Sequence, residues 1–127
     1  MYKSTITAMG HMAMDFLDQN MLILFNDNAP EELAEISVLH RAAPLEGTIE
    51  EGDILTLGPD QFVIRAVGDQ VNHTFSTMGH CTLMFNGQKE ASLPGAIELS
   101  GKGLPSIKIG ERLEISKGEL KNNVGNE

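Results

Sequence analysis

Four histidines and one cysteine are the side chains that could carry group-transfer or metal chemistry in this chain, namely His11, His40, His73, His80 and Cys81. A neutral imidazole is a nucleophile near neutral pH and can accept a phosphoryl group or ligate a metal ion. One histidine ends the apolar run "SVLH", and another follows a glycine in "STMGHCTLMF". These surroundings make His40 and His80 the two candidates for a chemical role.

His40 is predicted to lie on the outer face of a short extended segment. Side chains alternate between two faces along an extended chain, so Val38 and His40 share one side while Leu39 and Arg41 share the other. If Leu39 points into the core, His40 points outward, where a ring with an ordinary pKa near ~6.5 is largely neutral and nucleophilic. Such a ring could accept a phosphoryl group. The alternative is a surface or hydrogen-bonded histidine with a structural role only.

The second candidate, His80, is expected to open a strand directly after Gly79. A glycine lets the backbone approach closely and can leave an N–H group available to an anion. Thr82 falls on the same strand face two residues later, so Gly79, His80 and Thr82 together could hold a phosphate. The alternative is a histidine that only caps the end of a strand.

The remaining histidines and the cysteine are expected to carry no chemistry. His11 and His73 are interpreted as solvated loop residues, because neither has an acidic residue or a histidine at ligand spacing. Cys81 is interpreted as a small core residue, because no basic neighbour would stabilise its thiolate. The sequence has no glycine-rich phosphate loop, dinucleotide fingerprint, HExxH pattern or nucleophile-elbow serine. We therefore predict neither a metal site nor a cofactor.

The composition indicates one acidic protein: 127 residues include 18 acidic and 9 basic side chains, a net charge of −9. This charge disfavours nucleic acid and anionic membrane surfaces and favours a basic protein partner. One cysteine cannot form an internal disulfide, and reducing cytosol is then the default compartment. Aspartates interrupt the N-terminal apolar stretch, so neither a signal peptide nor a membrane span is predicted. We expect a cytoplasmic protein.

Strands are the elements that must position these histidines. Short runs with β-branched residues alternate with glycine-marked turns, and long helical periodicity is missing, which favours an all-β fold. The predicted strands are Lys3–Met9, Met21–Phe25, Asp53–Leu57, Gln61–Val67, Cys81–Phe85, Ala96–Leu99 and Arg112–Ile115, with a further extended segment at "SVLHR".

Four fragments recur in the same order in both halves of the chain, which favours an internal duplication. Two copies of a strand unit can bury their apolar faces by closing together, and closure also removes exposed sheet edges. We therefore predict a small closed β-barrel built from an internal duplication, with one domain over residues 1–116 and a frayed polar tail over residues 117–127. The matched fragments are "ITAMG" with "IRAVG", "MLILFN" with "CTLMFN", "LEGTI" with "LPGAI", and "IEEGDILTL" with "IKIGERLEI".

This pairing of fragments makes one segment of the first half longer than its counterpart, since Asp27–Pro44 stands against Gly87–Ser92. The longer segment is predicted to be an insertion that carries His40. It is also predicted to carry a short helix, Ala29–Ile36, whose first turn is capped by Asn28. Extra segments on a rigid barrel are places where function is often located.

The chain resembles the glucitol/sorbitol-specific enzyme IIA component of the bacterial phosphotransferase system, from about Thr5 to Ile115. The resemblance implies a cytoplasmic, all-β protein that takes a phosphoryl group from the histidine-containing phosphocarrier protein. It implies that the group then passes to a cysteine of the sugar-specific enzyme IIB, while the sugar crosses the membrane through enzyme IIC. The segments that carry the resemblance are "ITAMG", "FLDQNMLILFNDNAPEELAEISVLH", "LEGTIEEGDILTLG", "FVIRAVG", "MGHCTLMFNG", "LPGAIELSG" and "IGERLEI".

The resemblance also implies roles for the two candidate histidines. In the family the phosphorylated histidine lies at the position of His40, so His40 is expected to be the phosphorylated nucleophile. His80 matches the family's "GH" position, and we expect it to orient His40 or to stabilise the phosphoryl oxygens. The sequence departs from the family where a second histidine closely follows the first, because Arg41 and Ala42 stand there. This departure gives His80 more weight in any mechanism that needs two histidines.

Two other functions are open from the sequence. A metal-dependent small-barrel enzyme could use His40 and His80 with an acidic third ligand. A non-catalytic regulatory barrel could keep the scaffold without the relay. The sequence does not identify the transported sugar, because selectivity in such a relay rests with the membrane component.

Overall fold

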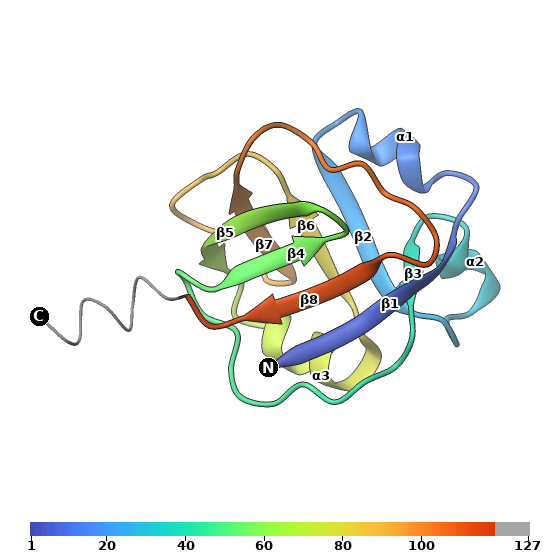
Figure 1. The fold of residues 1–127 in the computed structure, drawn as a ribbon, viewed down its shortest axis with the longest axis horizontal. Coiled ribbons are helices and arrows are strands. Elements are labelled where there is room, and N and C mark those ends of the chain that lie inside the picture. The colour runs from blue at the N-terminus through green and yellow to red at the C-terminus, as the bar shows by residue number, and fades with distance from the viewer. Residues whose placement is uncertain (119–127) are drawn as a thin grey trace, which may run out of the picture.

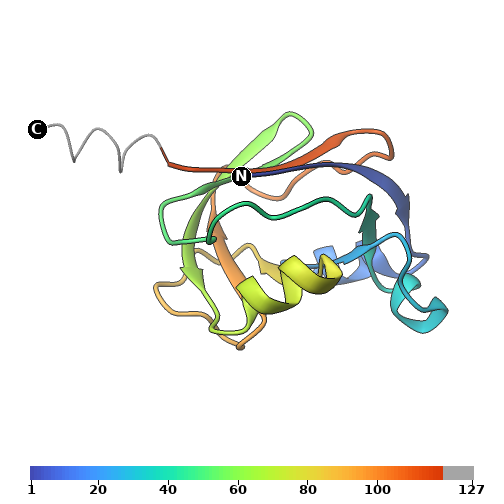
Figure 2. The same cartoon turned by 90° about the horizontal axis from the view of Figure 1, so that it is seen from below.

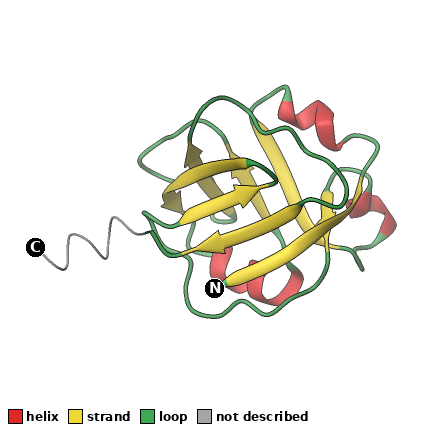
Figure 3. Cartoon of the chain, viewed as in Figure 1, coloured by secondary structure: helices red, strands yellow, loops and turns green. Residues whose placement is uncertain are grey.

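Eight strands close into a barrel in the computed structural model, which describes residues 1–118 (Figures 1 and 3). The strand order around the barrel is β1-β3-β2-β6-β7-β5-β4-β8. This confirms the predicted all-β class and closed barrel, and every predicted strand is present to within one residue at each end. The elements are β1 Tyr2–Met9, α1 Ala13–Leu17, β2 Met21–Asn26, α2 Glu31–Ala34, β3 Val38–His40, β4 Ile54–Leu57, β5 Asp60–Val67, α3 Val71–Met78, β6 Cys81–Met84, β7 Ala96–Ser100 and β8 Arg112–Ser116.

The two halves of the chain repeat the same strand pairing, as a duplication requires. β1 pairs with β3 and β5 pairs with β7, and a register shift follows Ile6 in one ladder and Ile64 in the other. Each half also joins two strands in parallel, β2 with β3 and β6 with β7. Ile6 faces His40 and Ile64 faces Leu99, so Leu99 is the counterpart of His40 in the second half.

One fragment pairing is wrong by a single residue. The match of "MLILFN" with "CTLMFN" makes Met84 the second-half counterpart of Leu24. In the strand ladders the counterpart is Leu83, because Leu24 lies beside Val38 and Leu83 lies beside Ile97, which occupy equivalent positions in β3 and β7. Leu24 and Leu83 are both fully buried, while Met84 is only half-buried. A slip of one residue exchanges the two faces of a strand, so burial distinguishes the two pairings.

The pairing of "LEGTI" with "LPGAI" is also wrong. Ile97, the last residue of "LPGAI", lies in β7 at the position that Val38 occupies in β3. The counterpart of "LPGAI" is therefore the segment that leads into β3. The β2–β3 connection over residues 27–37 and the β6–β7 connection over residues 85–95 have equal length, so the expected difference in length is not present between these strands. The first-half connection does carry a short helix, as expected.

That helix, α2, is shorter than the predicted Ala29–Ile36, and Asn28 does not cap it. Pro30 is the N-cap residue, with extended backbone angles and no side-chain capping bond. The ψ angle of Pro30 is 150°, which is not helical, so the helix begins after it. No residue of α2 is buried, and Leu33 is 36% exposed.

Helices α1 and α3 occupy equivalent connections in the two halves, and the sequence did not predict them. Each buries two apolar side chains four residues apart, Ala13 with Leu17 and Val71 with Phe75. Helical periodicity is recognised from apolar residues that recur over about 11–18 positions, and two apolar residues in a short helix do not produce such a pattern. None of the helices in residues 1–118 has the length and apolar character of a bilayer-spanning segment.

Helix α3 lies across one end of the barrel, with the segment that follows β3 running beside it (Figure 2). Asn72 of α3 ties the two together. Its side-chain oxygen accepts from the N–H of Ile49 at 2.7 Å, and its side-chain nitrogen donates to the carbonyl of Ile49 at 3.1 Å. Because Ile49 and the inner face of α3 are buried, this end of the barrel is closed by packed side chains.

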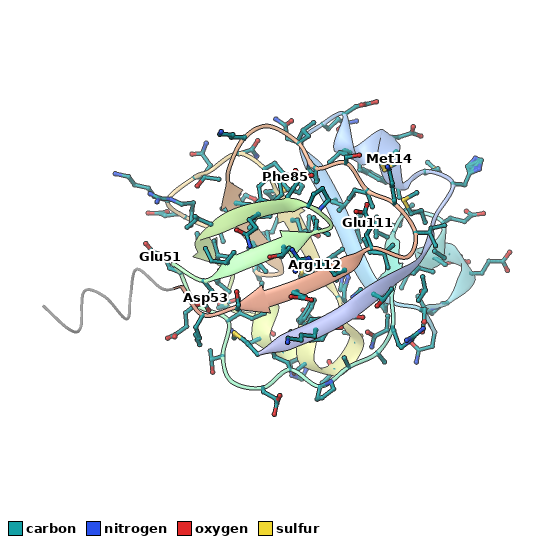
Figure 4. All side chains as sticks on the ribbon, viewed as in Figure 1. Met14, Glu51, Asp53, Phe85, Glu111 and Arg112 are labelled. Carbon is teal, nitrogen blue, oxygen red and sulfur yellow. The ribbon has the colours of Figure 1, made fainter. Side chains whose placement is uncertain are left out.

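The end of the described chain is held against the start of β4, which Figure 4 marks at Asp53. The Lys117 ammonium lies 3.3 Å from the buried carboxylate of Asp53 and donates to the carbonyl of Thr48 at 2.8 Å. The N–H of Gly118 donates to Asp53 at 3.4 Å. The predicted frayed tail therefore does not begin at residue 117, and residues 119–127 lie outside the described residues.

Candidate functional site

His40 lies inside the barrel with no exposed surface, so the prediction of an outward, partly exposed ring is wrong. Val38 and His40 are both fully buried, while Leu39 on the opposite face is also covered, at 8% exposure. The alternation of side chains along β3 was predicted correctly. Both faces of the strand carry apolar residues, however, so the sequence does not show which face turns inward. The strand ladder decides the face, because His40 stands opposite Ile6, a core residue.

Both ring nitrogens of His40 are hydrogen-bonded in the interior. Nε2 lies 2.8 Å from the carbonyl oxygen of Gly79, and Nδ1 lies 2.7 Å from the hydroxyl of Tyr2. A carbonyl only accepts, so Nε2 carries the proton in the neutral ring and Nδ1 accepts from the Tyr2 hydroxyl. Phe75 stacks on the ring, with centroids 5.7 Å apart and planes at 17°. These contacts hold the imidazole in one position.

Burial also sets the charge of these two groups. Desolvation lowers the pKa of His40 from its ordinary value, while the Gly79 carbonyl opposes this with a smaller effect. Desolvation raises the pKa of Tyr2 to about 12. His40 is therefore neutral and Tyr2 is a protonated donor at pH 7.

Gly79 connects the two predicted histidines, because the His40 ring is hydrogen-bonded to its carbonyl and His80 follows it in the chain. It ends α3 in the left-handed conformation, with a φ angle of 62°, and its N–H donates to the carbonyl of Phe75 at 2.9 Å. This N–H is therefore not available to an anion, contrary to the prediction. The predicted close approach is confirmed, because a Cβ atom here would collide with the side-chain oxygen of Asn26 and lie 2.7 Å from Cε1 of His40. Only glycine satisfies both conditions.

His80 is half-buried and follows Gly79 immediately. Its Nδ1 lies 3.1 Å from the carbonyl oxygen of Leu24, so Nδ1 carries the proton in this contact. Its ring stacks on Phe25, with centroids 4.6 Å apart and planes at 29°. Among the described residues, its Nε2 has no hydrogen-bond partner, and it is not sealed from solvent. The ring is therefore fixed on one side and open at one nitrogen.

The other predicted residues are less closely connected to this site. Thr82 is half-buried on β6, and within residues 1–118 no hydrogen bond joins it to His80, so its role in holding a phosphate stays a prediction. Cys81 is buried, and burial raises the pKa of its thiol to about 12, as expected of a core residue. His11 is exposed in a turn, and His73 is exposed on α3 rather than in the predicted loop.

Sequence reasoning missed Tyr2 and Asn26. Tyr2 precedes His40 by a long stretch of chain and meets it only because β1 pairs with β3. The side-chain oxygen of Asn26 is buried against Gly79 and has no hydrogen-bond partner among the described residues. A correct register between the halves would have indicated a core position for His40, because its counterpart is Leu99.

The sequence matches the family model "PTS system glucitol/sorbitol-specific IIA component" over residues 1–114. The chain belongs to this enzyme IIA family. The glucitol/sorbitol-specific EIIA components of Escherichia coli (strain K12) and Shigella flexneri are each 36% identical to it over 114 residues, which is 90% of this chain and 93% of theirs.

The enzyme IIA barrel is also similar to a solved structure. The crystal structure of a PTS system IIA component from Enterococcus faecalis V583 superposes with a TM-score of 0.79 at 27% identity, and covers 91% of this chain and 99% of that one. The family confirms the resemblance found in the sequence. The enzyme IIA protein described here is thus a component of the sugar phosphotransferase system and works with other components of that system.

Proposed function

We propose that this enzyme IIA protein is a cytoplasmic phosphoryl relay. An imidazole of the His40–Gly79–His80 site accepts a phosphoryl group from the histidine-containing phosphocarrier protein. The group then passes to the cysteine of the glucitol/sorbitol enzyme IIB, while the sugar enters through the membrane component. The observation that carries the proposal is the hydrogen bond from the His40 ring to the carbonyl of Gly79, the residue directly before His80, in a chain of this family.

The chemistry suits a site made of imidazoles and backbone carbonyls. Phosphoryl transfer passes through a loose transition state, so the protein mainly aligns donor and acceptor in line and excludes competing water. A phosphorus–nitrogen bond breaks on the donor as one forms on the acceptor, which keeps the first step nearly thermoneutral. In the second step the phosphorus–nitrogen bond breaks and a phosphorus–sulfur bond forms on enzyme IIB.

The resemblance assigns the acceptor role to His40 and an orienting or phosphate-stabilising role to His80. The glycine before His80 and the alternation along the strand add Gly79 and Thr82 in support. The geometry attaches a condition to this assignment. A donor reaches a nitrogen of His40 only after that nitrogen has released Tyr2 or Gly79 and the ring has been uncovered. An interior hydrogen bond left unmade costs about 1–3 kcal/mol, so His40 would be an acceptor only in a less populated open state.

A metal-dependent enzyme is a less suitable interpretation of the same residues. Both nitrogens of His40 are engaged by Tyr2 and Gly79, so this ring offers no lone pair to a metal ion in the described conformation. Elemental analysis of the purified protein tests the metal enzyme directly, and a stoichiometric transition metal would favour it. A regulatory barrel would instead bind the phosphocarrier and remain unphosphorylated.

Labelling tests the relay. The full chain is incubated with phosphoenolpyruvate, the upstream kinase and the phosphocarrier protein, and phosphate on the chain is measured. We expect one acid-labile, base-stable phosphohistidine per chain, which is lost when enzyme IIB is added. His73→Asn is the control for a histidine outside the site and should label like the wild type. An unlabelled wild-type chain would contradict the relay and favour a binding role.

A further inference from the structure

We infer, taking the proposed relay with His40 as its acceptor as the basis, that Tyr2 is a positioning residue for phosphoryl transfer. Its hydroxyl group turns from Nδ1 of His40 to the carbonyl of Arg41. The ring can then hold its proton on Nδ1 and present Nε2 to phosphorus. Two hydrogen-bond partners within reach of one hydroxyl, and the different surroundings of the two ring nitrogens, support this role.

In the closed structure neither ring nitrogen of His40 is ready to react. Nε2 carries the proton that it donates to the carbonyl of Gly79 at 2.8 Å, so it has no lone pair to offer. Nδ1 has the lone pair, but the Tyr2 hydroxyl donates to it at 2.7 Å. A nitrogen needs a free lone pair to attack phosphorus. The ring therefore has to change its tautomer or its partners before transfer.

The surroundings of the ring favour Nε2 as the reacting nitrogen. Nδ1 faces Tyr2, which belongs to the hydrophobic core and packs edge-on against the buried Phe75, with ring centroids 4.7 Å apart. Nε2 faces Gly79 at the end of α3. The neighbours of Gly79 are less covered, because Asn26 and His80 are only half-buried. A donor that reaches Nε2 thus displaces less of the core than one that reaches Nδ1.

The Tyr2 hydroxyl can serve both tautomers of the ring, because a hydroxyl both donates and accepts. When Nδ1 has no proton, the hydroxyl donates to it. When Nδ1 carries the proton, the hydroxyl oxygen accepts it and the hydroxyl proton turns to the Arg41 carbonyl, 3.4 Å away. A carbonyl oxygen has two lone pairs, so this one can accept from the Ser4 hydroxyl at 2.6 Å and from Tyr2 together. Burial raises the pKa of Tyr2 to about 12, so its proton is present at pH 7.

The transfer step balances without any further reactant. Once the ring is uncovered it exchanges protons with water, losing one from Nε2 and gaining one on Nδ1, with no net change. The phosphorus–nitrogen bond of the donor phosphohistidine breaks, and its electron pair returns to the donor ring. The lone pair on Nε2 of His40 forms the new phosphorus–nitrogen bond. The proton on Nδ1 stays in place, and the Tyr2 oxygen accepts it and stabilises the positive charge that develops on the ring.

The test compares Tyr2→Phe with a matched core variant. Tyr2→Phe removes the hydroxyl and keeps the aromatic ring that packs on Phe75. Ile64→Val is the control, because it removes one buried methyl group opposite Leu99, the counterpart of His40 in the second half. Folding is checked by circular dichroism and thermal unfolding. The initial rate of labelling is measured with the phosphocarrier system at a saturating phosphocarrier concentration, and ³¹P NMR distinguishes Nε2 from Nδ1 phosphohistidine.

We expect the wild type and Ile64→Val to label at the same rate, with phosphate on Nε2 of His40. Tyr2→Phe should label about tenfold more slowly, because the ring is no longer aligned. It should also divide its phosphate between Nε2 and Nδ1, because no hydroxyl covers the Nδ1 lone pair. The change of nitrogen separates positioning from stability, since a merely destabilised chain keeps the same reacting nitrogen.

Three results would overturn the inference while leaving the relay intact: phosphate on Nε2 alone in Tyr2→Phe, a wild-type labelling rate in that variant, or wild-type phosphate on Nδ1. A wild-type chain without label refutes the relay itself. If Tyr2→Phe does not fold, ¹⁵N NMR of the phosphorylated wild type decides the question. The Nδ1 proton of His40 should then be present and slow to exchange with water, and an Nδ1 without a proton would overturn the inference.

Discussion

Replacement of Tyr2 by phenylalanine tests how strongly the interior holds His40. The substitution removes one hydroxyl that lies 2.7 Å from Nδ1 of His40, and Tyr2 is only 2% exposed, so water does not readily replace it. An interior acceptor that loses its donor costs about 1–3 kcal/mol. We therefore expect the free energy of unfolding to fall by about 2 kcal/mol. For a chain of this size that is a decrease in Tm of roughly 5–10 °C.

Urea unfolding at pH 7.5 measures the loss, and a double-mutant cycle assigns it to the Tyr2–His40 pair. His40→Leu supplies the second side of the cycle, because leucine is what the second half carries at the matching position, Leu99. Tyr2→Phe should cost much less in the His40→Leu background, where only the 3.4 Å contact of the hydroxyl with the Arg41 carbonyl is lost. A Tyr2→Phe protein as stable as the wild type, or an equal loss in both backgrounds, would refute the geometry assigned to His40.

Two further predictions concern the same residues. Because burial lowers the pKa of His40 in the folded state, the unfolded chain binds a proton at this residue before the folded chain does as the pH falls below ~6.5. The free energy of unfolding should then decrease between pH 7 and pH 5, and His40→Leu should flatten this part of the curve; an unchanged slope in urea unfolding would argue against a buried neutral ring. Gly79→Ala should destabilise the protein by more than Gly47→Ala, since both have positive φ angles but only Gly79 has Asn26 and His40 against it. Left-handed backbone costs a non-glycine residue about 1–2 kcal/mol, so Gly47→Ala measures that strain and equal losses in the two variants would contradict the close approach.

The candidate site was predicted only in part from the sequence. His40 and His80 were selected by their surroundings, and the structure places the His40 ring on the carbonyl of Gly79, the residue before His80. The exposure predicted for His40 is wrong, because His40 is fully buried, whereas His80 is half-buried. The error followed from the choice of Leu39 as the inward residue, in a strand where both faces are covered by apolar neighbours.

The sequence by itself determined the strands, the duplication and the family. Strand alternation and glycine turns are local properties, so all eight strands could be located to within one residue. The pairing of "ITAMG" with "IRAVG" survives because the two fragments form equivalent strands with the same register shift. The closed barrel follows from two such units that must bury their apolar faces.

Only the tertiary structure decided which way His40 points and what it touches. A strand has a period of two residues, so its sequence shows that the faces differ but not which one is inside. The partner strand settles that, and here Ile6 turns His40 inward towards Tyr2 and Gly79. Those contacts join residues far apart in the chain. Their hydrogen bonds exist only once the barrel has closed.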